Sequence, residues 1–408
     1  MTNRRTVFAL ALTTAALPIT AIWRVGAQTG GPPPVQTTTL VLGQSLPGLN
    51  DAEKADFSAG LASFVTTEQR SDGLGPVFNG TSCGECHKAG APGGAGLDVG
   101  VARVTRIGGI VNGAYSDLAN FGGPVLQARS LREFDLSCPI SGEVVPREAN
   151  FVSLRITTPL FGAGLIENIP ANTILARIGM RDPDGISGQP NMVTNILTGK
   201  IDVGRFGWKA QHSNLEIFAA DAYLNEMGVT SSIFPNENLP QGRPIPPGWG
   251  STGGPEDEDG DVAKFSNFMR YLAPADRRLP ITPRVTQGEA VFNGIRCGAC
   301  HTPVMNTGPN PVAALSNKPV KLYSDLLLHR MGPGLADGIQ QGQAKGDQFR
   351  TAPLWGLSRR GFFMHDGRAT DYASAIMTHG GEATAARNRF MSLRPPDRDA
   401  LMAFLNSL

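Results

Sequence analysis

The stretch that decides the fold reads Cys83-Gly84-Glu85-Cys86-His87, and it returns as Cys297-Gly298-Ala299-Cys300-His301. The likeness extends upstream, because Val-Phe-Asn-Gly stands at 77–80 before the first copy and at 291–294 before the second. Over eleven positions, eight residues are identical at an offset of 214. A weaker sequence similarity follows the two copies, between residues 158–162 and residues 351–356. A repeat of this kind predicts two related domains, of which the first carries the larger insertions.

Each copy has the Cys-x-x-Cys-His pattern through which haem is attached to protein. One helical turn presents two thiols to the two vinyl groups of a haem, and the histidine that follows is the proximal ligand of the iron. Four of the five cysteines lie in the two copies. We therefore expect two covalently bound c-type haems, held by the residues Cys83, Cys86, His87, Cys297, Cys300 and His301. The alternatives are a dithiol redox pair and a zinc site built from both copies. A dithiol redox pair is expected in a strand–helix context, which is absent here, and a shared zinc site requires the two domains to meet.

The beginning of the chain predicts export. Arg4 and Arg5 precede an apolar run over 7–23, and Val25-Gly26-Ala27 offers small residues for cleavage. We expect a signal peptide over 1–27, a flexible tether over 28–48, and a periplasmic or secreted bacterial protein. An N-terminal membrane anchor is the alternative. No other apolar stretch is long enough to span a bilayer, so no stable membrane span is expected after cleavage.

Composition limits the fold and the partners. The chain has 408 residues, of which 41% are hydrophobic and 17% charged, enough for a sizeable core. A net charge of +1 argues against nucleic acid as a partner. The 50 glycines and 31 prolines favour loops and short helices. We expect domains over 49–234 and 260–408, joined by a linker over 235–259.

Helical periodicity is the main secondary-structure signal. It predicts helices over 51–64, 215–227, 262–272, 287–292, 372–378 and 397–405, whereas strand signals are few and short. The expected fold class is therefore mainly α, with two cytochrome c-like haem domains that carry long loops and insertions.

The order of motifs resembles a known superfamily. Two haem motifs about two hundred residues apart, followed by FFMHDG at 362–367 and Thr378-His379-Gly380, resemble the bacterial dihaem cytochrome c peroxidases, which include MauG-type enzymes. Segments 158–170, 204–210, 323–338 and 350–357 look closer to the branch called dihaem oxidoreductase, putative peroxidase, also labelled thiol-oxidoreductase-like. The resemblance implies reduction of hydrogen peroxide, or of another small oxidant, at the N-terminal haem. Electrons would enter at the C-terminal haem from a small redox protein or a quinol-linked donor.

The resemblance also bears on the sixth iron ligands. His379 matches the position where relatives carry a distal methionine, which implies a bis-His second haem with a lower potential. His329 is the runner-up ligand, His365 is expected near a propionate, and His212 is expected at the surface. Residues 88–100 hold no histidine or methionine, so we expect the first haem to be open.

Further site residues follow from the same likeness. Counting from Trp208, as in the family's distal segment, reaches Glu216, the candidate for proton transfer. Gln211 and Glu167 are weaker candidates, and Phe206 stands where the family has a distal glutamine. Trp208 is also a candidate, with Trp355, for a place between the haems, and packing in the core is the alternative for both.

Several interpretations stay open. An oxygenase acting on an organic or polymer substrate would need an apolar channel to the first haem, lined by residues such as Phe161, Phe206 and Trp208. A pure electron carrier would have both haems six-coordinate. The superfamily often holds calcium between its domains, but no motif here supports it, because a twelve-residue loop counted from Asp257 ends on Phe268. Cys138, the remaining cysteine, is expected to be structural.

Overall fold

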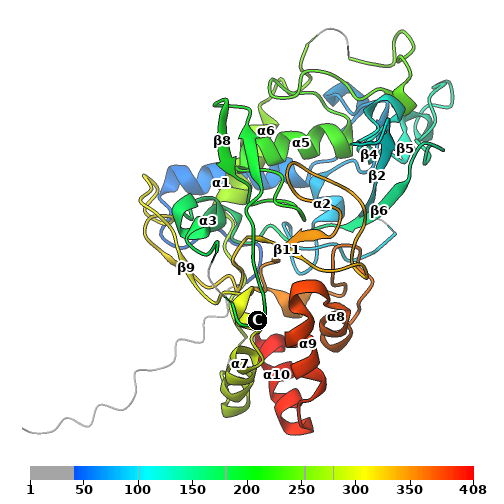
Figure 1. Ribbon diagram of the computed structural model, residues 1–408. Helices are drawn as coiled ribbons and strands as arrows, with labels where there is room; N and C mark the ends of the chain where they lie inside the picture. Colours follow the sequence, from blue (N-terminus) through cyan, green and yellow to red (C-terminus); the bar gives the residue numbers. More distant parts are fainter. Residues whose placement is uncertain (1–40, 101, 180–181, 252–253, 279) are drawn as a thin grey trace, which may run out of the picture. The chain divides into compact units, whose positions relative to one another are not determined.

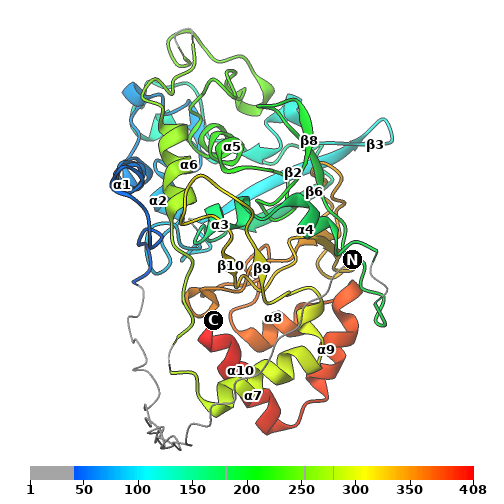
Figure 2. The ribbon, with the colours of Figure 1, turned by 90° about the vertical axis from the view of Figure 1, so that its left-hand side faces the viewer.

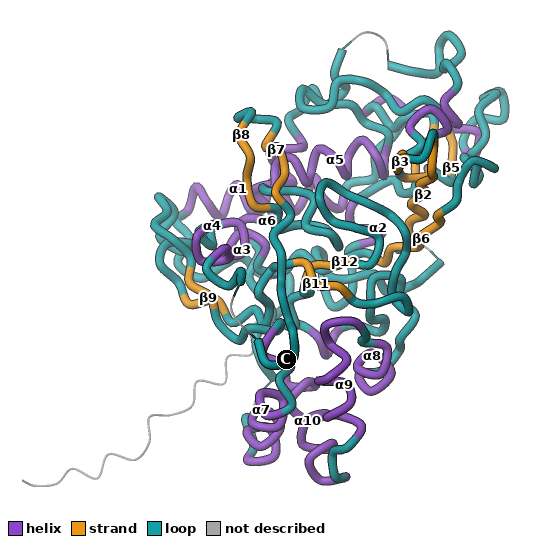
Figure 3. Tube along the Cα trace, viewed as in Figure 1, coloured by secondary structure: helices purple, strands orange, loops and turns teal. Residues whose placement is uncertain are grey.

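The computed structural model describes residues 41–408 except 101, 180–181, 252–253 and 279. The expected signal peptide and most of the expected tether lie outside the described residues. The described chain contains ten α-helices: α1 (Asp51–Val65), α2 (Cys83–Cys86), α3 (Ala163–Glu167), α4 (Ala171–Leu175), α5 (Leu215–Met227), α6 (Asp261–Tyr271), α7 (Pro283–Gly294), α8 (Tyr372–Thr378), α9 (Thr384–Met391) and α10 (Pro395–Ser407). Loops join most of these elements (Figure 3).

The strands of the described chain are short. They are β1 (Val77–Phe78), β2 (Arg103–Val111), β3 (Ala114–Ser116), β4 (Val125–Leu126), β5 (Arg129–Ser130), β6 (Phe151–Ile156), β7 (Met192–Asn195), β8 (Lys200–Val203), β9 (Met305–Asn306), β10 (Pro319–Val320), β11 (Leu328–Arg330) and β12 (Gln348–Arg350). Most of them form two-stranded antiparallel pairs.

One hydrophobic core gathers around α1, α5 and α6, which lie together in Figures 1 and 2. Helix α1 crosses α6 at Gly60, where an added side chain would come within 2.3 Å of the Lys264 backbone oxygen. One turn later, Phe64 packs on Phe268 with 4.6 Å between ring centroids. Glycine therefore lets the two backbones approach closely, and the aromatic pair fills the space beside the crossing.

A second core repeats this crossing between α7 and α10. A side chain at Gly288 of α7 would come within 1.9 Å of the Ala400 backbone oxygen. One turn later, Phe292 packs on Phe404 with 5.2 Å between ring centroids. Helix α8 contacts α9 and α10 in the same region (Figure 1). Each Cys-x-x-Cys-His copy thus follows a helix that crosses a partner at glycine.

The repeated Val-Phe-Asn-Gly segment takes two different conformations. Val77 and Phe78 form β1, which pairs antiparallel with β5. Phe292, at the matching position of the repeat, lies inside α7. Its structural counterpart in the first half is Phe64 of α1. Four identical residues do not fix secondary structure here, because tertiary contacts override local propensity.

An antiparallel sheet of β2, β3, β4 and β6 lies between the first motif and α5 along the chain. Strand β2 pairs with β6 from Arg103 opposite Ile156 to Gly108 opposite Phe151. The sheet matters for the site because it carries Arg106 on β2 and Arg155 on β6, which both border the cavity beside the first motif.

The expected mainly α class is confirmed only in part. Helices α1, α5, α6, α8 and α10 lie where periodicity placed them, and α7 begins four residues earlier than expected. The sheet around β2 and the helix α9 were not expected. The described residues cluster as one compact unit, and the two expected haem domains stay a prediction. Helix α6 begins inside the range expected for the second domain yet packs on α1 and α5, so a boundary drawn by packing would follow α6.

Candidate haem sites

The first motif forms the single helical turn α2. Ser82 caps it by accepting a hydrogen bond from the Glu85 N–H at 3.1 Å, and the His87 N–H donates to the Cys83 carbonyl at 3.0 Å. Cys83, Cys86 and His87 occupy positions i, i+3 and i+4, which share one face of a helix. The turn therefore presents both thiols and the imidazole in one direction.

A cavity of about 160 Å³ lies beside this turn and is bordered by both thiols and by His87. Its lining is mainly apolar, with Arg106, Arg155 and Gln211 among the polar exceptions. Among the described residues that border it, His87 is the single histidine. Burial lowers the pKa of His87 to about 4. Its buried Nδ1 has no hydrogen bond of normal geometry, although the backbone of Gly94 and Thr158 lies close enough to oppose that shift.

Glu226 is the single carboxylate among the described residues that border this cavity. It comes from α5, on the same face as Phe218 and Ala222, which also border the cavity at a spacing of four. Its Oε2 accepts a hydrogen bond from Asn79 Nδ2 at 3.0 Å, and burial raises the pKa of Glu226 to about 7. A carboxyl group with such a pKa exchanges protons near neutral pH, which acid–base catalysis requires.

The structure moves the candidate proton carrier from Glu216 to Glu226. Glu216 lies in the first turn of α5 and borders neither haem cavity. The two acids are ten residues apart on α5, which is nearly three helical turns and leaves them on different faces of the helix. The sequence analysis missed Glu226 because it chose the acid by counting from Trp208. The spacing of Phe218, Ala222 and Glu226 by four residues on a predicted helix could have indicated that Glu226 shares a face with apolar residues. Gln211, by contrast, borders the first cavity as expected.

Two thioether side chains also reach the first cavity, Met227 at the end of α5 and Met269 on α6. They are 2% and 3% exposed, respectively. Both lie far along the chain from residues 88–100, where the sequence offered no ligand. Because a methionine sulfur can bind haem iron, these are the two side chains that a search for a sixth ligand of the first haem must test.

The second motif is a 3₁₀ turn over Cys297–Ala299, in which the His301 N–H donates to the Cys297 carbonyl at 2.9 Å. His301 Nδ1 lies 3.0 Å from the Tyr323 carbonyl oxygen. A carbonyl only accepts, so Nδ1 carries the proton and Nε2 is left for a metal. Burial lowers the pKa of His301 to about 4, which keeps the ring neutral.

His379 stands at the C-terminal end of α8 and has the same arrangement. Its Nδ1 lies 2.8 Å from the Ala375 carbonyl oxygen, which again leaves Nε2 for a metal. His379 and His301 border one cavity of about 210 Å³, together with Cys297 and Cys300. Burial lowers the pKa of His379 as well. The geometry is therefore compatible with the predicted pair of axial histidines at the second haem.

His329 is the weaker candidate for that role. Its Nε2 lies 2.9 Å from Asp325 Oδ2 and its Nδ1 lies 2.8 Å from Glu382 Oε2. Burial lowers its pKa, but the hydrogen bonds to Asp325, Cys300 and Glu382 outweigh burial and raise it to about 12. An imidazolium has no lone pair for iron, so the geometry favours His379.

The two cavities fit one attached haem each better than the alternatives do. Burial raises the pKa of Cys86 and of Cys297 to about 12. Such thiols lack the thiolate character that a dithiol redox pair needs. The two motifs border different cavities, so a zinc site shared by both has no geometric support. In the part of the chain that the structure describes, no group of three or more His, Cys, Asp or Glu residues could hold a metal ion, zinc or calcium.

Trp208 borders both haem cavities. Its Nε1–H donates to the Ile156 carbonyl at 2.8 Å, and its own carbonyl accepts from the Arg350 N–H at 2.8 Å. The indole also contacts His365, with 6.5 Å between ring centroids. Of the two tryptophans considered, Trp208 is thus the one placed between the cavities, whereas Trp355 borders only a smaller cavity beside them.

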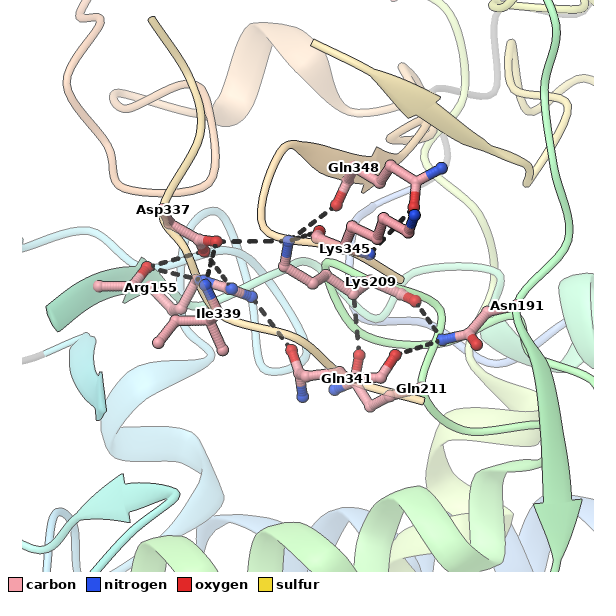
Figure 4. Close-up of polar contacts among 10 residues, drawn as sticks. Arg155, Asn191, Lys209, Gln211, Asp337, Ile339, Gln341, Lys345 and Gln348 are labelled. Atoms are coloured by element: carbon pink, nitrogen blue, oxygen red, sulfur yellow. Dashed lines mark hydrogen bonds and ion pairs between the residues drawn. The ribbon is translucent and has the colours of Figure 1, made fainter. Parts of the chain in front are cut away.

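A buried charge cluster follows directly on Trp208 (Figure 4). Lys209 Nζ donates to the carbonyls of Lys345 at 2.7 Å and Gln348 at 2.9 Å, and it lies 3.3 Å from Asp337 Oδ1. Asp337 also pairs with Arg155, which borders the first cavity. Burial lowers the pKa of Lys209 to about 8, against the attraction of Asp337. The cluster ties the loop before β12 to the segment that carries Trp208.

Other expected residues lie away from the cavities or differ from expectation. The surface position expected for His212 is wrong: it is 9% exposed, and its Nε2 lies 3.2 Å from Asp221 Oδ2. Glu167 joins α5 to α6, because its carboxylate accepts from the Leu215 N–H and pairs with Arg270. Cys138 is fully buried in the first core.

Two further expectations concern channels and membranes. Phe161, Phe206 and Trp208 border a cavity of only about 30 Å³, room for about one water molecule, which is far from a channel for a polymer. None of the described helices is both long and apolar enough to cross a membrane.

Comparisons with known proteins give the following likenesses. The family model described as "Di-haem oxidoreductase, putative peroxidase" matches residues 142–408. The diheme peroxidase BthA from Burkholderia thailandensis is 14% identical, with a TM-score of 0.41 over 87% of this chain and 86% of its own. A MauG-like protein associated with microbial copper homeostasis is 15% identical, with a TM-score of 0.32 over 61% of this chain and 89% of its own.

The solved structures also include hydrazine synthase from Kuenenia stuttgartiensis, 14% identical, with a TM-score of 0.33 over 63% of this chain and 73% of its own. No curated protein matches the chain. Because each of these three TM-scores lies below 0.5, these structural likenesses support no argument about activity.

Proposed function

We propose, on the premise that this chain belongs to the family of di-haem oxidoreductases described as putative peroxidases, that it reduces hydrogen peroxide at the first haem site and receives electrons through the second. A dihaem redox enzyme is what the family establishes. The substrate, the covalent c-type attachment and the periplasmic location are our proposals. Cys83, Cys86 and His87 would hold one haem, and Cys297, Cys300, His301 and His379 the other.

The proposal rests on one observation: different residues surround the two motifs. Four histidines border the second cavity, and two of them, His301 of the motif and His379, have the Nε2 left for a metal, so two protein ligands are at hand. The described border of the first cavity has one histidine and one titratable carboxyl group. When bound, a haem with an open iron position binds and reduces peroxide, whereas a haem with two strong ligands passes electrons.

The chain's own residues have separable tasks in this proposal. His87 and His301 bind the irons, and the carbonyl of Tyr323 orients His301. Glu226 moves a proton between peroxide and solvent, for which its pKa near neutrality is suited. Gln211 offers an amide that can orient peroxide by hydrogen bonding. Trp208 connects the two cavities, and the apolar lining limits the entry of water.

Peroxide consumption by the exported holoprotein tests the proposal. The protein is supplied with a reduced small cytochrome as donor, and oxidation of the donor is followed after peroxide is added. We expect turnover in the wild type and none in Cys83→Ser/Cys86→Ser, which lacks the first attachment site. Donor oxidation that is equal in both proteins, or absent from both, contradicts the proposal. Mass spectrometry of the same samples shows whether cleavage follows Ala27 and whether the haem is covalent.

A further inference from the structure

A buried tyrosine and a buried carboxyl group form a pair beside the first haem cavity. Tyr223 of α5 is 1% exposed, and Glu68, in the loop between α1 and β1, is 6% exposed. The Tyr223 hydroxyl donates to Glu68 Oε1 at 3.1 Å. Neither side chain borders the cavity itself, and the function proposed above uses neither. A buried ionisable pair of this kind is costly to fold unless it is satisfied internally, so its presence calls for an explanation.

An unbroken series of aromatic contacts joins this pair to the first motif. The Tyr223 ring packs edge-on against Phe265, with 5.1 Å between centroids. Phe265 contacts Phe64 at 6.4 Å, and Phe64 contacts His87 at 5.9 Å. Phe265, Phe64 and His87 all border the first cavity. Tyr223 is therefore within electron-transfer range of a haem held there, through packed aromatic rings and without intervening solvent.

The charges around Glu68 suit it to accept a proton. Apart from Tyr223, the carboxyl groups that act on Glu68 are Asp72 after α1, Asp257 before α6 and Asp261 at the start of α6. The Cys83 thiol also lies near enough for Glu68 to help raise its pKa. No basic side chain among the described residues forms an ion pair with Glu68. Burial, with these acids, raises its pKa to about 7, against the opposing effect of the Tyr223 hydrogen bond.

A second buried tyrosine shows the contrast within the same molecule. The Tyr323 hydroxyl donates to Glu289 Oε1 at 2.7 Å near the second motif. Glu289, however, also pairs with Arg277 at 3.0 Å. A guanidinium beside a carboxylate favours its charged form and so opposes protonation. Of the two tyrosine–glutamate pairs, only Tyr223–Glu68 thus combines a phenol with an acceptor that has no cation beside it.

We propose that Tyr223 and Glu68 form an additional redox site, which gives one electron to the first haem site during peroxide reduction. The proposal rests on the function proposed above, because hydrogen peroxide is its oxidant. Tyr223 loses one electron and its O–H bond breaks, and the proton forms a new O–H bond on the Glu68 carboxylate. Peroxide takes up two electrons and two solvent protons to give two waters. Tyr223 supplies one of these electrons, and the second haem site supplies the other.

This site would protect the protein when donors are scarce. With the second site already oxidised, Tyr223 supplies one of the two electrons and a haem bound at the first site would supply the other, and the tyrosyl radical persists until a donor electron returns. The proton on Glu68 then returns to the phenolate oxygen. The pair is closed to solvent, which lengthens the lifetime of the radical.

Electron paramagnetic resonance after rapid freezing tests the proposal. The fully oxidised holoprotein is mixed with one equivalent of hydrogen peroxide without donor, and peroxide loss is measured in the same samples. We expect a tyrosyl signal in the wild type that narrows when tyrosine is ring-deuterated. The signal should be absent from Tyr223→Phe, weaker in Glu68→Gln, and unchanged in the matched control Glu289→Gln, which alters the second tyrosine–glutamate pair. In the wild type its yield should rise with pH through about 7, as Glu68 ionises.

The outcomes separate this proposal from the function that it extends. Peroxide loss without a tyrosyl signal, or a signal of wild-type size in Tyr223→Phe, overturns the redox role of the pair and leaves the peroxidase intact. An unchanged signal in Glu68→Gln overturns the role of Glu68 as proton acceptor. A wild type that consumes no peroxide overturns both.

Discussion

The two Cys-x-x-Cys-His regions share a turn but differ in what surrounds it. In both, the histidine N–H donates to the carbonyl of the first cysteine, at 3.0 Å in the first and 2.9 Å in the second. Beyond that turn, His301 has a carbonyl partner for Nδ1, whereas His87 Nδ1 has none of normal geometry. The second cavity has His379 on its border, and the first has Glu226.

This difference assigns different roles to one attachment motif. A hydrogen bond to Nδ1 strengthens a histidine as a ligand, and a second histidine closes the iron. A buried carboxyl group with a pKa of about 7 instead suits a site where protons move. In the proposed function, the motif would bind the haem, while residues on α5 and at the end of α8 would determine what each haem does.

The largest expected effect separates the two motifs directly. Replacing both cysteines of one motif with serine, in Cys83→Ser/Cys86→Ser or in Cys297→Ser/Cys300→Ser, removes two thioether bonds. We expect each variant to retain one covalent haem, and the combination of both to retain none. Intact-protein mass spectrometry counts the haems. Two covalent haems in either variant would contradict the claim that each motif attaches one haem.

Glu226→Gln sharpens the assignment of the proton carrier. Removing a general acid–base group typically lowers the rate by about 10²–10⁴-fold, and we expect a loss of that size in peroxide reduction. The carboxylate is the form that accepts a proton, so the wild-type rate should rise with pH through about 7, and the variant should lose this dependence. Glu216→Gln, on the same helix but away from the cavity, is the matched control and should retain the wild-type rate. A large loss of rate in Glu216→Gln with little loss in Glu226→Gln would instead identify Glu216 as the proton carrier.

Lys209→Met tests the contact between the segment of Trp208 and the loop before β12. The change removes two hydrogen bonds and one ion pair of a fully buried ammonium group. Breaking a buried ion pair typically costs about 3–5 kcal/mol. Because Asp337 keeps Arg155 as a partner, we expect the free energy of unfolding to fall by about 3 kcal/mol, the lower end of this range. Lys345→Met changes an exposed lysine of the same loop and should have little effect in denaturant unfolding. Equal stability of the two variants would show that Lys209 does not hold this junction.

The helix crossings give the smallest expected effect. In Gly288→Ala, the new Cβ meets the Ala400 backbone oxygen, and overpacking of this kind costs about 1–3 kcal/mol. Gly294→Ala, at the end of the same helix, meets nothing within 4 Å and is the matched control. Gly60→Ala should behave as Gly288→Ala does if the two crossings are equivalent. Thermal unfolding of the three variants measures this, and a cost at only one crossing would show that the two cores differ.

Local sequence predicted much of this arrangement. The two motifs, the helices α1, α5 and α8, and the border positions of Gln211, Trp208 and His379 follow from spacing, periodicity and likeness. Glu226 did not, because which face of α5 meets a cavity depends on packing against α6 and β1. His212 was misplaced for the same reason, since its burial depends on Asp221 nine residues later. The sheet around β2 was missed because its pairing joins residues about 50 apart.

Low-temperature electron paramagnetic resonance of the oxidised holoprotein, alone and with equimolar peroxide, tests the central difference most directly. We predict one high-spin signal from the first haem, which peroxide consumes, and one low-spin bis-His signal, which changes in His379→Ala. Two low-spin signals that peroxide leaves unchanged would contradict an open first site. In that case, loss of one low-spin signal in Met227→Ala or in Met269→Ala would identify the residue that closes it.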